Sequence, residues 1–306
     1  MNIDNYEKYY MPTKFISGWW WVALDADTDL PPELPGKKET EWFSNLEASQ
    51  VEALTFWYGR NTTTRCESAY ERLRDLSSFS QLKSLSIPLE VVPHIDISSV
   101  ATHLEHLHIA DPSVVNEAHF SDKNYRFLMF DEYFPALRTL KLFVSPKWCA
   151  NFSVQKYPKL KWFTSDFDLD PKGIGLKFFL PSQTVQGFEL NSITRKYTLK
   201  YLKTDVKALR FWSITAKSFD FGVLENFYNL EYLSIYSSVA TVDCAALALL
   251  PNLNELTICS SRDILNIQSL LLHKKIKKLA IYLNRTQVNE ELKNALRQHI
   301  EHVKFD

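Results

Sequence analysis

Apolar residues recur along this chain of 306 residues in one short phrase: an aliphatic residue, two variable residues, an apolar residue, one variable residue and a second apolar residue. The clearest copies are LEYLSI from Leu230, LNELTI from Leu253 and IKKLAI from Ile276. Their middle apolar residues are separated by 23 residues in both steps. Repetition at a period of roughly 20 to 50 residues is typical of proteins built from stacked repeats, so the pattern predicts a solenoid.

Eleven segments of the chain fit this phrase with varying quality. They begin at Val51, Leu82, Leu104, Leu137, Leu160, Val185, Val206, Leu230, Leu253, Ile276 and Ile300. Apolar and variable residues alternate within each copy, and this period of two is the period of a β-strand. Each copy is therefore predicted to form one short strand, with its apolar side chains in the core and its variable side chains on an open face.

The segments between the later copies have a helical period. They span residues 242–250, 263–273 and 289–299. The last of them starts with Glu290 and ends near Arg297, an arrangement of charges that the helix dipole favours. The later repeats are thus predicted to consist of a strand followed by a helix.

The phrases LEYLSI, LNELTI, LRTLKL, LEHLHI and LKSLSI resemble the leucine-rich repeat family, in its irregular, intracellular form, from about Val51 to the end of the chain. The resemblance implies an α/β solenoid, a horseshoe with a parallel sheet on its concave side. In that family an Asn or Cys usually follows the strand and bonds the turn. Here only Asn284 matches, and Ser238 and Ser261 are weaker substitutes.

We expect one continuous solenoid domain of about ten or eleven repeats over residues 51–306, preceded by an N-terminal cap over residues 1–50. The cap contains the apolar segment 15–24, which is too short to cross a membrane as a helix and is predicted to be a strand. Two long steps in the repeat mark insertions at residues 59–81 and 110–136. The N-terminal half is therefore expected to be irregular.

Charge and cysteine content narrow the classes of partner and the compartment. The chain contains 35 Lys and Arg residues and 36 Asp and Glu residues, which gives a formal net charge of -1. No net positive charge therefore favours the binding of nucleic acid or an anionic membrane. The four cysteines lie far apart, in a pattern typical of reduced thiols. The first ten residues lack the basic start and apolar run of a secretory signal. We therefore expect a cytoplasmic protein that binds neither nucleic acid nor membrane.

The residues that offer catalytic chemistry are few. His106 and His108 lie two places apart on a predicted strand, so their imidazoles point to the same side, and with Asp111 they form the candidate centre of a metal-dependent hydrolase. Both also occupy variable positions, where any polar residue is permitted, and this is the favoured interpretation. The chain has no glycine-rich phosphate loop and no nucleophile elbow. It is predicted to be non-enzymatic, with no cofactor and no metal.

The variable positions of the strands are predicted to line up on the open face, where large aromatic residues and charges recur. The predicted partner-binding residues are Trp57, Phe143, Trp162, Asp166, Glu189, Arg210, Trp212, Tyr232, Tyr236 and Tyr282. Aromatic residues and Arg dominate the binding energy of protein interfaces. The alternative for some of these rings is that the insertions or the N-terminal segment cover them.

These observations favour a protein-protein interaction module whose ligand is a protein. A bacterial immunity protein that neutralises a toxin is the narrower expectation, and it is an analogy. The phrase at residues 134–142, FPALRTLKL, also resembles repeats of substrate adaptors in ubiquitin ligases. That adaptor role is the alternative among binding proteins, and the metal-dependent hydrolase is the alternative from another class.

Overall fold

The computed structural model describes residues 6, 16, 19–23, 37–39, 47–57, 75–88, 95–110, 133–142, 154–166, 184–193, 199, 202, 204–259, 261–282 and 288–305. The chain forms two compact units. The N-terminal unit spans Glu7–Phe163, and the C-terminal unit combines Met1–Tyr6 with Thr164–Asp306. The expected single domain over residues 51–306 stays a prediction.

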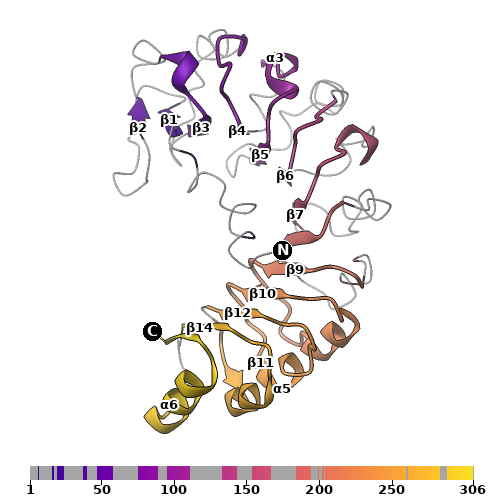
Figure 1. Cartoon of the computed structure of the whole chain (residues 1–306), viewed down its shortest axis with the longest axis vertical. Coiled ribbons are helices and arrows are strands. Elements are labelled where there is room, and N and C mark those ends of the chain that lie inside the picture. The colour runs from indigo at the N-terminus through magenta and orange to yellow at the C-terminus, as the bar shows by residue number, and fades with distance from the viewer. Residues whose placement is uncertain are drawn as a thin grey trace. The chain divides into compact units, whose positions relative to one another are not determined.

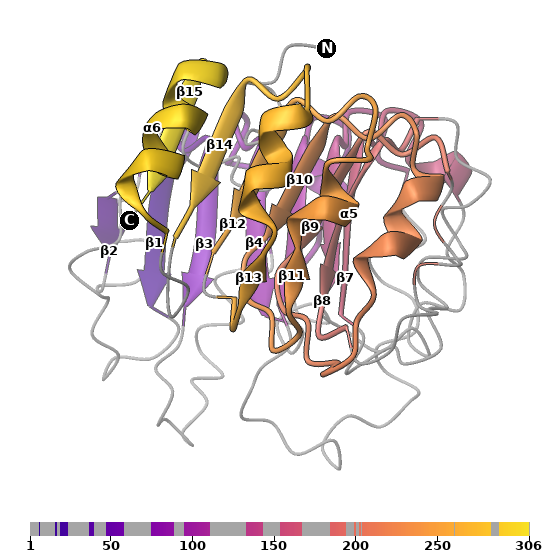
Figure 2. The same cartoon turned by 90° about the horizontal axis from the view of Figure 1, so that it is seen from below.

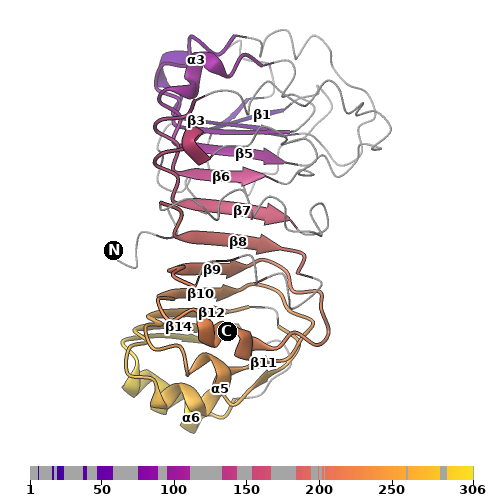
Figure 3. The same ribbon diagram turned by 90° about the vertical axis from the view of Figure 1, so that its right-hand side faces the viewer.

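The N-terminal unit is built from parallel strands. In chain order they are β1 (Trp19–Ala23), β2 (Lys37–Glu39), β3 (Ala53–Trp57), β4 (Ser84–Pro88), β5 (His106–Ala110) and β6 (Thr139–Leu142), with β7 (Trp162–Asp166) at the sequence border of the unit. Their order in the sheet is β2-β1-β3-β4-β5-β6-β7. Among the described residues of this unit, three short helices accompany the strands: η3 (Ala48–Gln50), α3 (Ser98–Ala101) and η7 (Val154–Lys156). The arrows of β5, β6 and β7 run in the same direction (Figure 3).

The C-terminal unit repeats the same plan and carries more helix (Figure 1). Its main strands are β8 (Gly187–Asn191), β9 (Ala208–Phe211), β10 (Tyr232–Ile235), β12 (Glu255–Ile258), β14 (Lys278–Ile281) and β15 (His302–Phe305), paired in that order. A second, two-stranded sheet joins β11 (Val242–Asp243) to β13 (Ile264–Leu265). The helices are η9 (Phe221–Asn226), α5 (Cys244–Leu247), η10 (Ile267–Leu272) and α6 (Glu290–His299). Helix α5 packs against η9 and η10, and α6 packs against η10 and β15, on the side of this unit that faces the viewer in Figure 2.

The prediction of one strand per copy of the phrase is confirmed in all eleven copies, and each strand begins at the third residue of its copy. The middle apolar residues are in register: Leu233 lies opposite Leu256, which lies opposite Leu279. Leu54 and Leu85 are paired in the same way in the N-terminal unit. These leucines are buried. Because a strand alternates its faces, this register stacks these leucines on one another in the core of each unit.

The cap segment forms strands, as predicted for residues 15–24. Strand β1 pairs in parallel with β3, with Trp20 opposite Leu54, so it covers the backbone edge of the first repeat strand. Residues 1–50 were expected to form one cap next to the first repeat. Tyr6 instead belongs to the C-terminal unit.

Only one of the three predicted helices has its expected length. Helix α6 begins after Asn289, whose Oδ1 accepts a hydrogen bond from the N–H of Leu292 at 2.8 Å, and it ends at His299. The other two segments were predicted too long, since α5 has four residues and η10 is a 3₁₀-helix. In those repeats β11 and β13 take up part of the segment, which leaves chain for only a short helical turn.

Serine replaces asparagine in the turn ladder, as expected for Ser238 and Ser261. The Ser238 hydroxyl donates to the carbonyl of Ala240 at 2.9 Å and accepts from its N–H at 3.1 Å. Parallel bridges join Ile214, Ser238 and Ser261. Asn284 and most of both insertions (59–74 and 111–132) lie outside the described residues. Cys244 is buried and Cys259 is half-buried, and Cys66 and Cys149 lie outside the described residues. In the part of the chain that the structure describes, none of the helices has the length and apolarity needed to cross a membrane.

Candidate functional site

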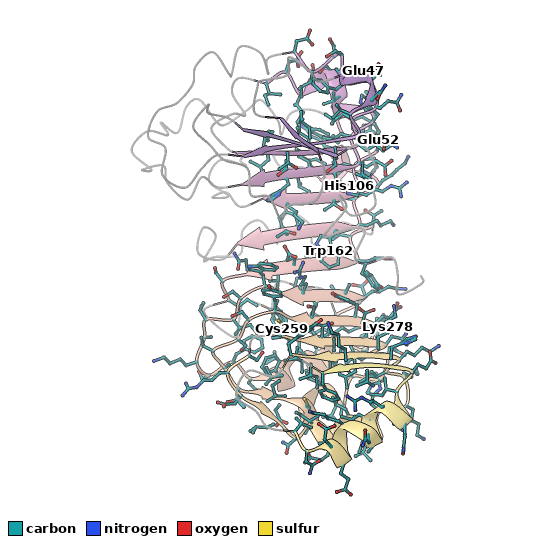
Figure 4. The ribbon with its side chains drawn as sticks, turned by 90° about the vertical axis from the view of Figure 1, so that its left-hand side faces the viewer. Glu47, Glu52, His106, Trp162, Cys259 and Lys278 are labelled. Carbon is teal, nitrogen blue, oxygen red and sulfur yellow. The ribbon has the colours of Figure 1, made fainter. Side chains whose placement is uncertain are left out.

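The open strand face of the C-terminal unit carries the third, fifth and seventh residues of each copy, which alternate with the core residues. Strand register orders these residues into three columns. The third places hold Gly187, Ala208, Tyr232, Glu255, Lys278 and His302; the fifth places hold Glu189, Arg210, Ser234, Thr257, Ala280 and Lys304; the seventh places hold Asn191, Trp212, Tyr236, Cys259 and Tyr282. Cys259 and Lys278 lie toward opposite ends of these strands, as their places require (Figure 4).

Two aromatic rings at seventh places form a stack. Trp212 directly follows β9 and Tyr236 directly follows β10, and the N–H of Tyr236 donates to the carbonyl of Phe211 at 2.8 Å. The ring centroids of Trp212 and Tyr236 are 4.3 Å apart, with 2° between the ring planes. Their exposed fractions are 39% and 40%. The expectation that these two rings reach solvent is therefore confirmed.

A buried ion pair lies beside this stack. Arg210 Nη1 donates to Glu189 Oε2 at 2.9 Å, and the two residues are only 5% and 3% exposed. The guanidinium carbon of Arg210 is 4.7 Å from the centroid of the Trp212 ring, within the range of a cation-π interaction. We expected Glu189 and Arg210 to be exposed partner contacts. The prediction that they are exposed is wrong, because both side chains are buried. Neighbouring strands lie about 4.8 Å apart, so the two side chains at paired fifth places satisfy each other and support Trp212.

The backbone next to the stack is unusual. Ser192, directly after β8, has a φ of 54°, a left-handed conformation that serine seldom adopts. Its N–H donates to Oδ1 of Asn191 at 2.9 Å, and its side chain is buried. The N–H of Trp212 donates to the carbonyl of Leu190 in the same strand end, so the strained residue lies near the stack. Strain of this kind collects at functional sites.

Two of the predicted rings are buried. Trp162 is fully covered and Tyr232 is 3% exposed, so their prediction as solvent-facing contacts is wrong. Tyr6 lies on Tyr232, with ring centroids 5.4 Å apart, which is the covering by the N-terminal segment that the sequence left open. An indole has a large apolar area, and its burial in Trp162 follows from the free energy gained when that area leaves water.

Four other residues were predicted to contact the partner, and the structure describes the side chain of one of them. Tyr282 is partly exposed, and the ammonium nitrogen of Lys304 lies 5.0 Å from its ring centroid. Trp57 and Asp166 end strands β3 and β7, but their side chains lie outside the described part of the structure, as does Phe143 altogether. Their partner contacts stay predictions.

A polar groove that the sequence did not predict lies further along the open strand face. Its volume is about 630 Å³, and β12, β14 and β15 form it together with Glu301. The small side chains of Thr257 and Ala280 leave this space open. At its third places, Lys278 Nζ lies 4.0 Å from Glu255 Oε2. The signal available in the sequence was the run of small and charged variable residues in the last three repeats.

The chain resembles several solved structures at low sequence identity. No protein-family model and no curated protein matches the chain. Two internalins of Listeria monocytogenes align with 12% and 16% identity and TM-scores of 0.32 and 0.41; the alignments cover 85% and 84% of this chain and 82% and 81% of theirs. A leucine-rich repeat protein of Leptospira interrogans aligns with 12% identity and a TM-score of 0.37, covering 84% of this chain and 79% of its own.

The deciding observation is in the chain itself, where every copy of the phrase forms one parallel strand and the leucines of successive copies lie opposite one another. This is a leucine-rich-repeat fold. In such a fold the side chains at third, fifth and seventh places are the ones that can meet a ligand across several repeats. The fold therefore assembles the aromatic stack and the polar groove from residues far apart in sequence.

The histidines of the leucine-rich-repeat strand β5 are engaged within the sheet. His106 Nδ1 lies 3.1 Å from Thr139 Oγ1, and His108 Nδ1 lies 3.1 Å from Ser86 Oγ. Burial, followed by the positive charge of Lys141 nearby, lowers the pKa of His108 to about 3; burial and then nearby positive charges lower that of His106 to the same value. Among the described residues, no group of three His, Cys, Asp or Glu side chains could hold a metal ion, and Asp111 lies outside them. The described geometry offers the hydrolase alternative no support.

Proposed function

We propose that this protein is a non-catalytic interaction module that binds a protein partner through the open strand face of its C-terminal unit and the loops beside it. The observation that carries the proposal is the stack of Trp212 on Tyr236, two large rings that remain about two-fifths exposed. Single exposed apolar residues are ordinary, but two rings stacked in parallel present a larger apolar area at one point.

The stack is preorganised for binding. Arg210 lies against Trp212 and is itself held by Glu189, so the indole has few orientations to lose when a partner covers it. Rings that bury much area with little loss of conformational entropy make large contributions to protein interfaces. The strained backbone at Ser192 next to the stack supports the same location.

The polar groove gives this face a second region of different chemistry. Glu255 and Lys278 line it together with His302 and Lys304, so it offers both signs of charge. A partner that lay along the open strand face would meet aromatic rings at β9 and β10 and charged side chains of both signs at β12 to β15. Interfaces combine an apolar centre with a polar rim in this way, and the polar region contributes specificity.

The narrower proposal is a bacterial immunity protein that occupies a toxin and blocks it. It needs a binding face and no turnover, and the aromatic stack is compatible with that mode of action. A substrate adaptor of a ubiquitin ligase would use the same face and is the alternative, since the phrase at residues 134–142 resembles repeats of such adaptors. The two proposals differ in what the captured partner is.

The experiment is a pull-down from native cells with the wild-type chain and two variants, followed by mass spectrometry. The test variant is Trp212→Ala/Tyr236→Ala. The matched control is Tyr228→Ala, which removes another exposed ring of the same unit, in the turn before β10. A partner that wild type and control retain and the test variant loses supports the proposal. Equal retention by all three would exclude the aromatic stack as the binding site.

The nature of the partner separates the narrower proposals. A toxin whose growth inhibition is relieved by co-expression of the wild-type chain, and not of the double variant, supports the immunity role. Recovery of ubiquitin-ligase subunits supports the adaptor role. For the hydrolase alternative, the purified chain is analysed for zinc, and the hydrolase is removed if no zinc is bound and a chelator leaves the stability unchanged.

A further inference from the structure

Tyr6 makes a contact across most of the chain. Its hydroxyl donates to Oε2 of Glu231 at 3.2 Å, across a separation of 225 residues. Its ring centroid lies 5.4 Å from that of Tyr232, with 38° between the ring planes, and Tyr6 is only 2% exposed. A residue of the N-terminal segment therefore occupies the open strand face at the start of β10.

The strand face is shaped to receive this ring. The third places of β8 and β9, beside Tyr232, hold Gly187 and Ala208, so the face is shallow there. Glu231 is positioned by its neighbour strand, because its N–H donates to the carbonyl of Lys207 at 2.8 Å and its Oε1 lies 3.2 Å from Lys207 Nζ. This arrangement leaves Oε2 to accept the phenol hydroxyl. A phenol ring thus finds an aromatic surface and a charged acceptor together.

We propose that Tyr6 is a built-in competitor, whose ring occupies the open strand face at the start of β10 and has to leave before a protein partner can lie along that strand. This inference rests on the proposed function, because it names the regulation of the same face. Tyr232 lies on the strand that leads into Tyr236, so a partner that covers the stack and extends along β10 meets Tyr6. A covalently attached ligand competes through its high effective concentration, and the apparent affinity of the partner equals its intrinsic affinity multiplied by the fraction of molecules in which the face is open.

The first experiment tests whether the segment is a ligand of the face. A labelled synthetic peptide with the sequence of residues 1–12, MNIDNYEKYYMP, is titrated into the wild-type chain, into Tyr6→Ala and into the control Tyr228→Ala. Because Tyr6→Ala empties the site, it should bind the peptide at least about tenfold more tightly than wild type or control. Replacing Tyr6 by Ala in the peptide, or Glu231 by Gln in the Tyr6→Ala chain, should weaken that binding about tenfold or more.

Two outcomes of this experiment would overturn the inference. One is equal binding of the peptide to wild type and Tyr6→Ala, or binding that ignores Glu231. The other is a Tyr6→Ala chain whose melting temperature falls by many degrees, which would make Tyr6 a fixed structural element. Tyr6→Phe keeps the ring and loses only the hydrogen bond, and competition predicts an intermediate peptide affinity for it. Size-exclusion chromatography over a range of concentrations checks that Tyr6 acts within one chain, and a dimer that Tyr6→Ala dissolves would contradict this.

The closing experiment separates this inference from the proposed function. Partner captured in the pull-down is titrated against wild type, Tyr6→Ala and Trp212→Ala/Tyr236→Ala. Tyr6→Ala should bind it at least about threefold more tightly than wild type, since the competing segment is weakened. Equal affinity of wild type and Tyr6→Ala, with loss of binding in the double variant, would overturn the competitor and leave the binding face intact. Unchanged binding in the double variant would instead overturn the proposed function.

Discussion

The rings of Trp212 and Tyr236 lie parallel, 4.3 Å between centroids and 2° between planes, because the two residues hold the same seventh place in successive repeats. Twenty-four residues separate them in the chain, and the parallel pairing of β9 with β10 brings them together. Arg210 lies two residues before Trp212 and so points to the same face, and the pairing of β8 with β9 places Glu189 next to Arg210. One periodic register thus creates both the exposed stack and its buried support.

Loss of either ring of the stack should weaken partner binding without unfolding the chain. Trp212→Ala and Tyr236→Ala are each expected to cost about 2 kcal/mol or more of binding free energy, because hot-spot rings contribute on this scale. Both rings are partly exposed, so the melting temperature should change little. Isothermal titration with the partner and calorimetric melting measure the two quantities. A large fall in melting temperature would show that these rings belong to the core.

Truncation of a stacked leucine should have the opposite effect. Leu233→Ala or Leu256→Ala is expected to lower the free energy of unfolding by about 2 to 5 kcal/mol, because each opens a cavity in the core of the C-terminal unit. Urea denaturation of the purified variants measures it. Leu272→Ala is the control, since that leucine is exposed on η10 and its loss should cost no more than about 0.5 kcal/mol. Similar losses for all three would contradict the assignment of face and interior.

The buried ion pair gives a third prediction. Arg210→Met removes the guanidinium from the buried Glu189 carboxylate and should destabilise the chain by about 3 to 5 kcal/mol. The double variant Glu189→Met/Arg210→Met removes both charges and should recover much of that loss. A double-mutant cycle in urea separates the interaction from the single effects. Additive losses in the double variant would mean that the two side chains are not coupled.

The buried imidazoles of β5 predict how stability depends on pH. Their pKa values fall to about 3 in the folded chain from an ordinary 6.5. Between these values the unfolded chain binds protons that the folded chain does not, so stability falls as the pH drops below about 6.5 and levels off near 3. Each imidazole contributes a slope of up to about 1.4 kcal/mol per pH unit.

Urea denaturation between pH 7 and pH 4 measures this slope. His106→Asn/His108→Asn should flatten it, because that variant has lost both buried imidazoles. A slope that survives in the β5 double variant would assign the pH dependence to other groups.

The repeat strands could be predicted from the sequence residue by residue. Each begins at the third place of its phrase, because the alternation that defines the phrase is the alternation of a strand, a local property of the backbone. The helical segments were predicted less well, because α5 and η10 share their segments with β11 and β13, and that short sheet forms only between neighbouring repeats. Residues 289–299 stand alone between two strands, and there the pattern predicted α6 correctly.

For the candidate site, too, the sequence predicted one part and the tertiary structure decided the rest. Periodicity in the sequence determined that Trp212, Tyr236, Glu189 and Arg210 share one face of the strands, because side-chain direction follows from position within the phrase. Exposure on that face was decided only by tertiary structure. Arg210 is buried because its partner lies on the next strand, and Tyr232 is buried because Tyr6, 226 residues before it, lies on its ring. Solvent exposure depends on whatever part of the chain comes to cover a side chain, and a pattern with a period of about 23 residues contains no information on a contact of that range.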